Sequence, residues 1–273
     1  MKMEHHTGSE FGSYAKHGEE GHTAHGDIKK PRSRLDLSGE WEVTLEGSPV
    51  AYPIHLPGTL DGENIGPENP MRTLDHLARK RKYIGKACYR KTIRIPEEFE
   101  NRHVELSFDR CLWKSTVYMD GAFVGSCDSL STPHTYDVTA FCSAGFHELL
   151  IEVDNRQRSG ASCHGYGEEE QTVWNGILGE FIMTASDKIY IEAVRIYPDI
   201  QHNRVSVEVG VCNGLLCDEL TRLEAAVIQN GEVIGTAVSK IELCSRRADV
   251  ILLVDLIKPA QLWDEFSPHL CRL

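Results

Sequence analysis

The sequence lacks long apolar runs and carries few basic residues relative to acidic ones. No stretch of its 273 residues approaches the ~20 apolar residues of a membrane span, so we expect no membrane partner. Lysine and arginine total 29 against 41 acidic residues, giving a formal net charge of −12. Because phosphate contacts need local cations, no nucleic-acid partner is expected. The basic run at 79–82 is the one feature typical of a nucleic-acid patch, and an exposed loop explains it in an acidic chain.

The cysteines show no C-x-x-C pair and no regular spacing. There are nine of them, an odd number, and several lie inside apolar runs, where cysteine behaves as a small hydrophobe. This pattern predicts neither a zinc site nor a redox cofactor. Reduced thiols are typical of a cytosolic protein, so a cytoplasmic location is expected.

The N-terminal segment lacks both an apolar signal-peptide core and any periodicity. Five histidines fall in its first 25 residues: His5, His6, His17, His22 and His25. A metal-binding tract is one interpretation. A disordered leader over residues 1–34 is the favoured one, because glycine, glutamate and histidine dominate the segment.

Alternation with a period of two dominates the rest of the chain. Val205, Val207, Val209 and Val211 alternate with polar or small residues, and similar runs occur at 104–108, 117–119 and 149–153. Such runs indicate half-buried strands. The pairs Asp-Gly at 120–121 and Asn-Gly at 230–231 predict tight hairpin turns. Helical patterns are scarce, with a turn or two at 74–83 and 259–265, so we expect an all-β protein.

The phase of this alternation changes at one place. Ile189 and Ile191 share one face, whereas Val194 and Ile196 resume one residue out of step, which predicts a bulge or a change of sheet. We place a domain boundary near Pro198. The predicted domains are a first sandwich at 35–198 and a smaller second one at 199–273.

Several segments, in order, resemble one family. They are LSGEWEV (37–43), HLPGTLDGENIG (55–66), YIGKACYRKTIRIP (83–96), VELSFDRCLWKSTVYMDGAFVG (104–125), YDVTAFCSAGFHELLIEVDNR (136–156), QTVWNGILGEFIMTA (171–185) and WDEFSPHLCRL (263–273). Together they resemble the N-terminal part of glycoside hydrolase family 2, which includes β-galactosidases and β-glucuronidases. The resemblance implies a jelly-roll, galactose-binding-like sandwich followed by an immunoglobulin-like sandwich that stops before its last strand is complete.

The same resemblance implies where catalysis would occur. In the family, a pair of glutamates on a (β/α)₈ barrel performs retaining hydrolysis. A barrel takes ~250 residues, and too few follow position 198, so we expect no catalytic residue here. The implied partner is a separate barrel or a second copy of the chain. The carboxylate run at 168–170 is a rival catalytic site, but a solvated loop explains it better.

The resemblance also indicates sugar-binding candidates. Trp174 and Asn175 lie in the segment that approaches the family's active site, and Asn69 and Asp61 lie in loops of the same domain. Core packing is the alternative for Trp174, and a turn before proline is the alternative for Asn69. Family members often carry an acid two residues before this tryptophan, where this chain has Thr172.

Two functional hypotheses follow. The first is the non-catalytic N-terminal portion of a β-galactosidase-like enzyme. The second is a free-standing carbohydrate-binding or protein-interaction module built from two sandwiches.

Overall fold

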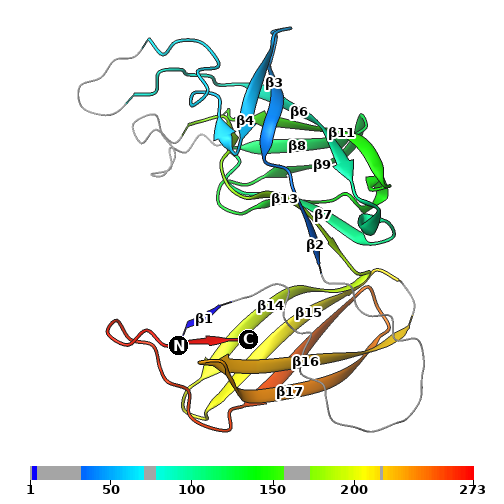
Figure 1. Ribbon diagram of the computed structural model, residues 1–273, viewed down its shortest axis with the longest axis vertical. Coiled ribbons are helices and arrows are strands. Elements are labelled where there is room, and N and C mark those ends of the chain that lie inside the picture. Colours follow the sequence, from blue (N-terminus) through cyan, green and yellow to red (C-terminus); the bar gives the residue numbers. More distant parts are fainter. Residues whose placement is uncertain (1, 5–31, 71–77, 157–172, 216–217) are drawn as a thin grey trace. The chain divides into compact units, whose positions relative to one another are not determined.

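The computed structural model describes residues 2–4, 32–70, 78–156, 173–215 and 218–273. It divides into two compact units (Figure 1). One comprises Ser33–Ala185, called the first sandwich here, and the other comprises Met1–Arg32 with Ser186–Leu273, called the second sandwich. The division falls before Ser186, earlier than the boundary predicted near Pro198, because the strand at 189–199 pairs within the second sandwich.

The first sandwich contains a six-stranded sheet in the order β4-β3-β6-β11-β8-β9 and a four-stranded sheet in the order β10-β7-β13-β2. A two-stranded ribbon, β12-β5, accompanies them. The strands are β2 (Ser33–Asp36), β3 (Gly39–Leu45), β4 (Ala51–Leu56), β5 (Gly58–Thr59), β6 (Lys86–Ile95), β7 (His103–Phe108), β8 (Lys114–Met119), β9 (Ala122–Asp128), β10 (His134–Asp137), β11 (Gly145–Asp154), β12 (Gly176–Ile177) and β13 (Phe181–Ser186). Two 3₁₀ turns, η1 (Glu97–Phe99) and η2 (Thr139–Phe141), complete it.

Alternating side chains of the two sheets form one core in the first sandwich. On β6, Ala87, Tyr89, Ile93 and Ile95 are buried while the residues between them face outward or lie half-buried. Trp41 of β3 stacks on Phe181 of β13, with ring centroids 5.0 Å apart. Since these rings come from different sheets, they join the two layers in the way the sequence pattern predicts.

The second sandwich contains a three-stranded sheet, β14-β15-β18, and a four-stranded sheet, β1-β19-β16-β17. Its strands are β1 (Lys2–Glu4), β14 (Ile189–Asp199), β15 (Arg204–Asn213), β16 (Glu219–Gln229), β17 (Glu232–Leu243), β18 (Arg247–Asp255) and β19 (Leu270–Arg272). The four predicted valines of β15 are buried, and they pack in one cluster with side chains of β16, β17 and β18. The described residues contain no α-helix, which confirms the all-β prediction.

Local predictions are mostly confirmed. The register shifts between Ile191 and Ala193, which is the expected bulge. Asp120 and Gly121 both have positive φ, and so do Asn230 and Gly231, as tight hairpins of this type require. The helical turn expected at 259–265 is wrong: this segment is irregular. The leader is ordered where it is described, because Lys2–Glu4 pairs in parallel with β19.

Candidate functional site

The turn before β12 carries the indole of Trp174. This side chain is half-buried and packs against a small cluster of Leu112, Trp113 and Val173. Its ring nitrogen Nε1 is buried and has no hydrogen-bond partner among the described residues. A buried N–H without an acceptor lowers the stability of the fold by about 1–3 kcal/mol. A ligand that accepts a hydrogen bond from this nitrogen would remove that cost. The candidate Trp174 therefore combines a partly open aromatic surface with an unused donor.

Asn175, the neighbouring candidate, holds the turn in place from inside the domain. Its side chain is 2% exposed. The Nδ2 group donates to the carbonyls of Gly85 and Val153, each at 3.1 Å, and Oδ1 accepts from the Tyr89 hydroxyl at 2.7 Å. Both donors are used within the protein, so the structure gives this amide a positioning role and leaves none of its hydrogens for a ligand.

Asn155 is a second buried amide at this turn, and the sequence analysis did not single it out. Its Nδ2 donates to the carbonyls of Tyr83 at 2.9 Å and Trp174 at 3.0 Å, and its Oδ1 accepts from the Gly85 amide at 2.9 Å. The residue follows β11 directly and is fully buried. The sequence signal that could have identified it is an asparagine directly after a strand of alternating apolar residues.

The loop that carries Asp61 lies beside the Trp174 turn. β5 pairs antiparallel with β12, and the Leu60 amide donates to the Asn175 carbonyl at 3.0 Å. Gly176 permits this approach, since a Cβ there would lie 2.2 Å from the Gly58 carbonyl oxygen. Asp61 is half-buried. Burial raises the pKa of the Tyr89 hydroxyl well above its ordinary value, and nearby charges that include Asp61 add to the effect. The structure thus brings Asp61 and Trp174–Asn175 into one region.

Asn69 belongs to a separate loop. Its amide nitrogen donates to the Lys80 carbonyl at 2.9 Å, and its side chain donates to the Arg79 carbonyl at 3.0 Å. Arg81 donates to the Gly66 carbonyl at 3.2 Å, across the same loop. The side chain of Asn69 and one cation of the basic run thus close this loop at its base.

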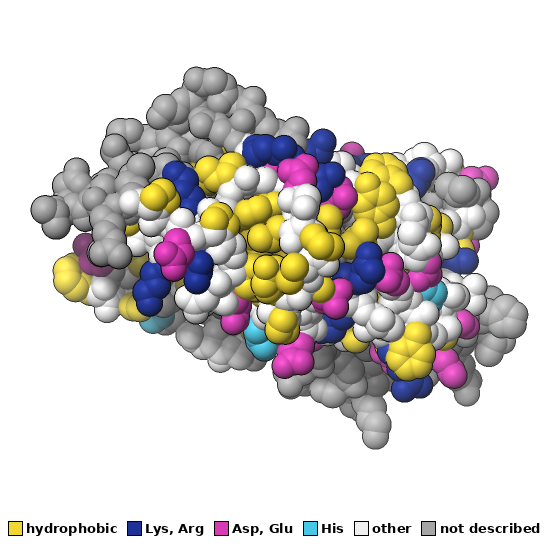
Figure 2. Space-filling model, turned by 90° about the horizontal axis from the view of Figure 1, so that it is seen from above, with side chains coloured by type: hydrophobic (Ala, Val, Ile, Leu, Met, Phe, Trp, Pro, Cys, Tyr) yellow, Lys and Arg dark blue, Asp and Glu magenta, His cyan; other side chains and the backbone are white. Residues whose placement is uncertain are grey.

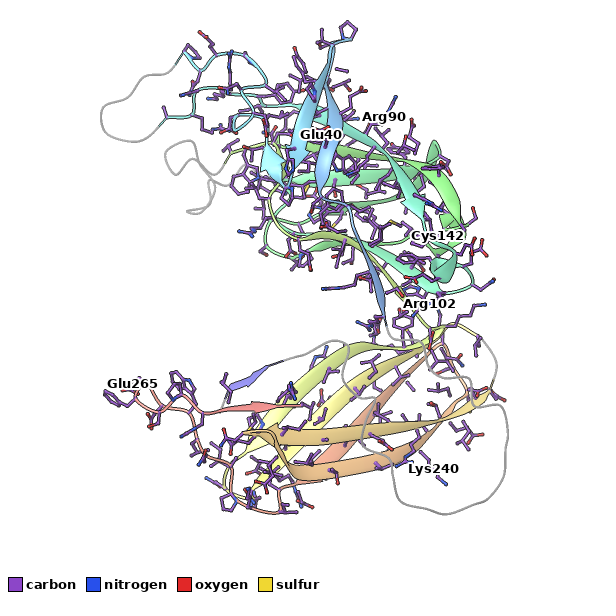
Figure 3. All side chains as sticks on the ribbon, viewed as in Figure 1. Glu40, Arg90, Arg102, Cys142, Lys240 and Glu265 are labelled. Atoms are coloured by element: carbon purple, nitrogen blue, oxygen red, sulfur yellow. The ribbon has the colours of Figure 1, made fainter. Side chains whose placement is uncertain are left out.

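A shallow polar cavity of about 240 Å³ opens on the outer face of the six-stranded sheet. It is lined by Glu46, Lys86, Lys114, Thr116, Glu152, Asp154 and Arg156. Lys86 pairs with Glu152 at 3.0 Å. Arg156 donates three hydrogen bonds to the Asp154 carboxylate, two from its side chain and one from its backbone amide. Arg90 of β6, which is labelled in Figure 3, forms a further ion pair between the strands, at 3.7 Å from Glu148 of β11. Acidic and basic groups are also intermixed on the face seen in Figure 2, so the excess negative charge is not gathered there.

Several predicted features lie outside the described residues. They are the carboxylate run at 168–170, Thr172, and the five leader histidines. Among the described residues, no group of three or more His, Cys, Asp or Glu side chains is arranged to hold a metal ion. No helix in the described ranges is long and apolar enough to cross a bilayer. The described part of the site therefore offers stacking and hydrogen bonding, contributed mainly by Trp174.

Curated relatives match more than half of the chain. A β-galactosidase of Thermoanaerobacter pseudethanolicus is 23% identical over 164 residues, which cover 56% of this chain and 22% of the relative. A β-galactosidase of Halalkalibacterium halodurans is 26% identical over 195 residues, covering 68% of this chain and 18% of the relative. The chain therefore matches about a fifth of the length of these enzymes.

Solved structures show the same fold over most of the chain. A β-glucuronidase of Bacteroides uniformis aligns with a TM-score of 0.71 at 18% identity, covering 87% of this chain and 29% of that one. A β-D-glucuronidase of Dictyoglomus thermophilum aligns with a TM-score of 0.61 at 17% identity, covering 90% and 41%. The match covers both sandwiches, because neither alone amounts to that share of the residues.

The family profile described as "Glycosyl hydrolase 2 galactose-binding domain-like" matches residues 41–179, half of the chain. This range contains Asp61, Asn69, Trp174 and Asn175 and most of the first sandwich. The predicted galactose-binding-like fold is thereby confirmed. The chain belongs to the glycosyl hydrolase 2 family through this galactose-binding-like domain.

Proposed function

We propose that this chain acts as the non-catalytic N-terminal portion of a β-galactosidase-like glycosidase. In this proposal, the first sandwich contacts a carbohydrate at the Trp174 turn, and both sandwiches support a (β/α)₈ barrel. The observation that carries the proposal is the buried, unpartnered Nε1 of Trp174 on a half-buried indole. A sugar hydroxyl would accept from this nitrogen, and the C–H face of a sugar ring fits a flat aromatic surface.

The other candidates support this contact in different ways. Asn175 and Asn155 fix the backbone of the Trp174 turn through six hydrogen bonds. Asp61 lies on the adjacent loop, where a carboxylate would accept from a sugar hydroxyl. We expect Asn69 to act through the shape of its loop, since its side-chain amide already donates to the Arg79 carbonyl.

Sugar contact is tested by following the indole N–H signals of ¹⁵N-tryptophan-labelled protein during titration with methyl β-galactoside and methyl β-glucuronide. We expect the Trp174 signal, assigned with the Trp174→Phe variant, to shift and saturate. Trp41 provides the internal control, because its Nε1 already donates to the Leu37 carbonyl at 2.9 Å. A Trp174 signal that stays in place with both sugars, up to their solubility limits, would count against sugar contact.

Support of a barrel is tested separately with aryl β-glycosides. We expect no turnover by the chain alone, because the family's catalytic glutamates lie on the barrel. Mixing the chain with the separately expressed barrel of the Halalkalibacterium enzyme should give turnover that neither component shows alone. Turnover by the chain alone that is lost in the Glu168→Gln or Glu170→Gln variant would overturn the non-catalytic assignment.

A further inference from the structure

One reactive kind of peptide step occurs in three different environments of this fold. Asparagine is followed by glycine at 175–176, 213–214 and 230–231. In such a step, the backbone nitrogen of the glycine can attack the side-chain amide carbon of the asparagine, because glycine has no Cβ to hinder the approach. The three steps share this chemistry, so the surrounding structure determines which of them reacts.

The step at Asn175 is protected by burial and by the hydrogen bonds of its side chain. Asn175 is 2% exposed. Both hydrogens of its Nδ2 group are used, one by the carbonyl of Gly85 and one by that of Val153. Since Nδ2 is the group that would have to leave, a reaction at this step requires the first sandwich to open locally.

The step at Asn213 is protected at both reacting groups. Asn213 is 1% exposed, and its Nδ2 donates to the Leu243 carbonyl at 3.2 Å. The attacking group, the amide nitrogen of Gly214, donates to the Lys188 carbonyl at 2.7 Å. Both of these bonds must break before the ring can close, so this step also depends on an opening of the fold.

The step at Asn230 lies at the tip of a hairpin and lacks both protections. Gln229 of β16 pairs with Glu232 of β17, so Asn230 and Gly231 make up the whole turn. Both are exposed, and the amide nitrogen of Gly231 donates to no acceptor within the described part of the chain. The Nδ2 of Asn230 donates to the side-chain oxygen of Gln261 at 3.0 Å, at an exposed position where water competes for the same bond.

We propose that Asn230 is a site of spontaneous deamidation, and that the fold protects the other two Asn-Gly steps. The Gly231 nitrogen bonds to Cγ of Asn230, the Cγ–Nδ2 bond breaks, and Nδ2 leaves as ammonia with the proton of the glycine amide. Water then opens the five-membered imide at either of its two carbonyls, which gives aspartate or isoaspartate. Isoaspartate adds one carbon to the backbone of a two-residue turn, so it weakens the pairing of β16 with β17. The reaction does not involve Trp174, so it is independent of sugar binding.

The proposal is tested by incubating the full chain in mildly alkaline buffer prepared with H₂¹⁸O and locating the label by peptide mass spectrometry. The label enters when water opens the imide, so it marks product formed during the incubation. A parallel sample in urea sets the duration, which ends once all three Asn-Gly steps have reacted there. In the native chain, Asn230 should react at least about tenfold faster than Asn175 or Asn213, because those two react only through openings of the fold.

The Asn230→Gln variant is the matched control, because glutamine would have to close a larger, six-membered ring. It should lose the label at position 230 and keep the slow rates at the two buried steps. The fall in melting temperature on incubation should also be larger for the wild type than for this variant. Equal rates at all three steps of the native chain, or a native Asn230 that stays unlabelled while the urea sample reacts, would overturn the proposal.

Discussion

The hydroxyl of Tyr89 donates a 2.7 Å hydrogen bond to Oδ1 of Asn175, across 86 positions of the sequence. Tyr89 lies on β6 inside the six-stranded sheet, and Asn175 precedes β12 in the Trp174 turn. Both side chains are buried. The bond thus connects the core of the first sandwich to the segment that presents the candidate sugar contact.

Replacing Asn175 should destabilise the first sandwich. Asn175→Ala removes both amide donors and leaves the Tyr89 hydroxyl without its acceptor. We therefore expect a loss of about 3 kcal/mol in the free energy of unfolding. Tyr89→Phe removes one donor and should cost about 1 kcal/mol. Urea denaturation measures both. Ser131→Ala, at an exposed loop position, is the control and should leave the midpoint unchanged. Equal midpoints for Asn175→Ala and Ser131→Ala would contradict the positioning role.

Gly176 should tolerate no side chain. A Cβ there would lie 2.2 Å from the Gly58 carbonyl oxygen and 2.9 Å from the Thr59 Cα, so Gly176→Ala should force β5 and β12 apart. We expect the free energy of unfolding, measured by thermal or urea denaturation, to fall by about 3 kcal/mol. Gly47→Ala separates steric overlap from backbone strain, because Gly47 also has positive φ but has no atom within 4 Å of the added Cβ. Gly47→Ala should lower the free energy of unfolding by only about 1 kcal/mol. Similar costs for the two variants would argue against the overlap.

His134 should make the first sandwich less stable in mild acid. Its Nε2 bonds to the Ser129 carbonyl, which can only accept, so Nε2 carries the proton and Nδ1 accepts from the Ser115 hydroxyl. Burial lowers the pKa of His134 below its ordinary value of 6.5. The unfolded chain therefore binds this proton at a higher pH than the folded one does. Stability is fully present above about pH 6.5 and declines as the pH falls toward the folded pKa, by up to about 1.4 kcal/mol per pH unit.

The histidine effect is measured as the change in melting temperature between pH 7 and pH 5.5. His134→Gln should reduce this change, since glutamine does not titrate. His55→Gln, at an exposed position of β4, should retain the wild-type change. If all three proteins respond equally to pH, the buried histidine is not the group responsible.

The described cysteines should differ in their reactivity. Cys111, Cys142 and Cys271 are buried, and burial raises the pKa of Cys142 to about 12. Cys244 is exposed. Because the thiolate is the reactive form, iodoacetamide at pH 8 should alkylate Cys244 first and leave the three buried thiols intact. Peptide mass spectrometry locates the label, and labelling in urea should remove the difference. Early alkylation of Cys111 in the native protein would contradict the packing described here.

Local sequence signals predicted much of this fold, because turns and alternation depend on near neighbours. Asp120-Gly121 and Asn230-Gly231 form the expected tight turns, and the bulge at Ile191–Ala193 follows from the phase change. At 259–265 the helical pattern failed, because Gln261 exchanges two hydrogen bonds with Gln229 of β16 and a local turn follows it. There, Asp264 accepts from the amides of Phe266 and Ser267, and Trp263 bridges to Pro268.

The roles of the site residues were harder to predict, because they depend on contacts distant in sequence. In the sequence alone, Asn175 is a polar residue beside a tryptophan, and this pattern is compatible with ligand binding. Its partners, Tyr89, Gly85 and Val153, are 22 to 90 positions away, and only the fold shows that they consume its donors. The early division before Ser186 has a similar cause, since β14 could not be assigned to a sandwich until its pairing with β15 was known.

The position of β11 inside its sheet determines which parts of the first sandwich open to solvent first. β11 pairs with β6 over ten residues and with β8 over six, so both of its edges are covered. β4 and β9 lie at the two ends of that sheet. Amide hydrogens of β6 and β11 should therefore exchange with solvent deuterium only in the largest openings, whereas those of β4 and β9 exchange through local fraying. Since Asn155 and Asn175 attach the Trp174 turn next to these central strands, the candidate site is tied to the part of the domain that opens last.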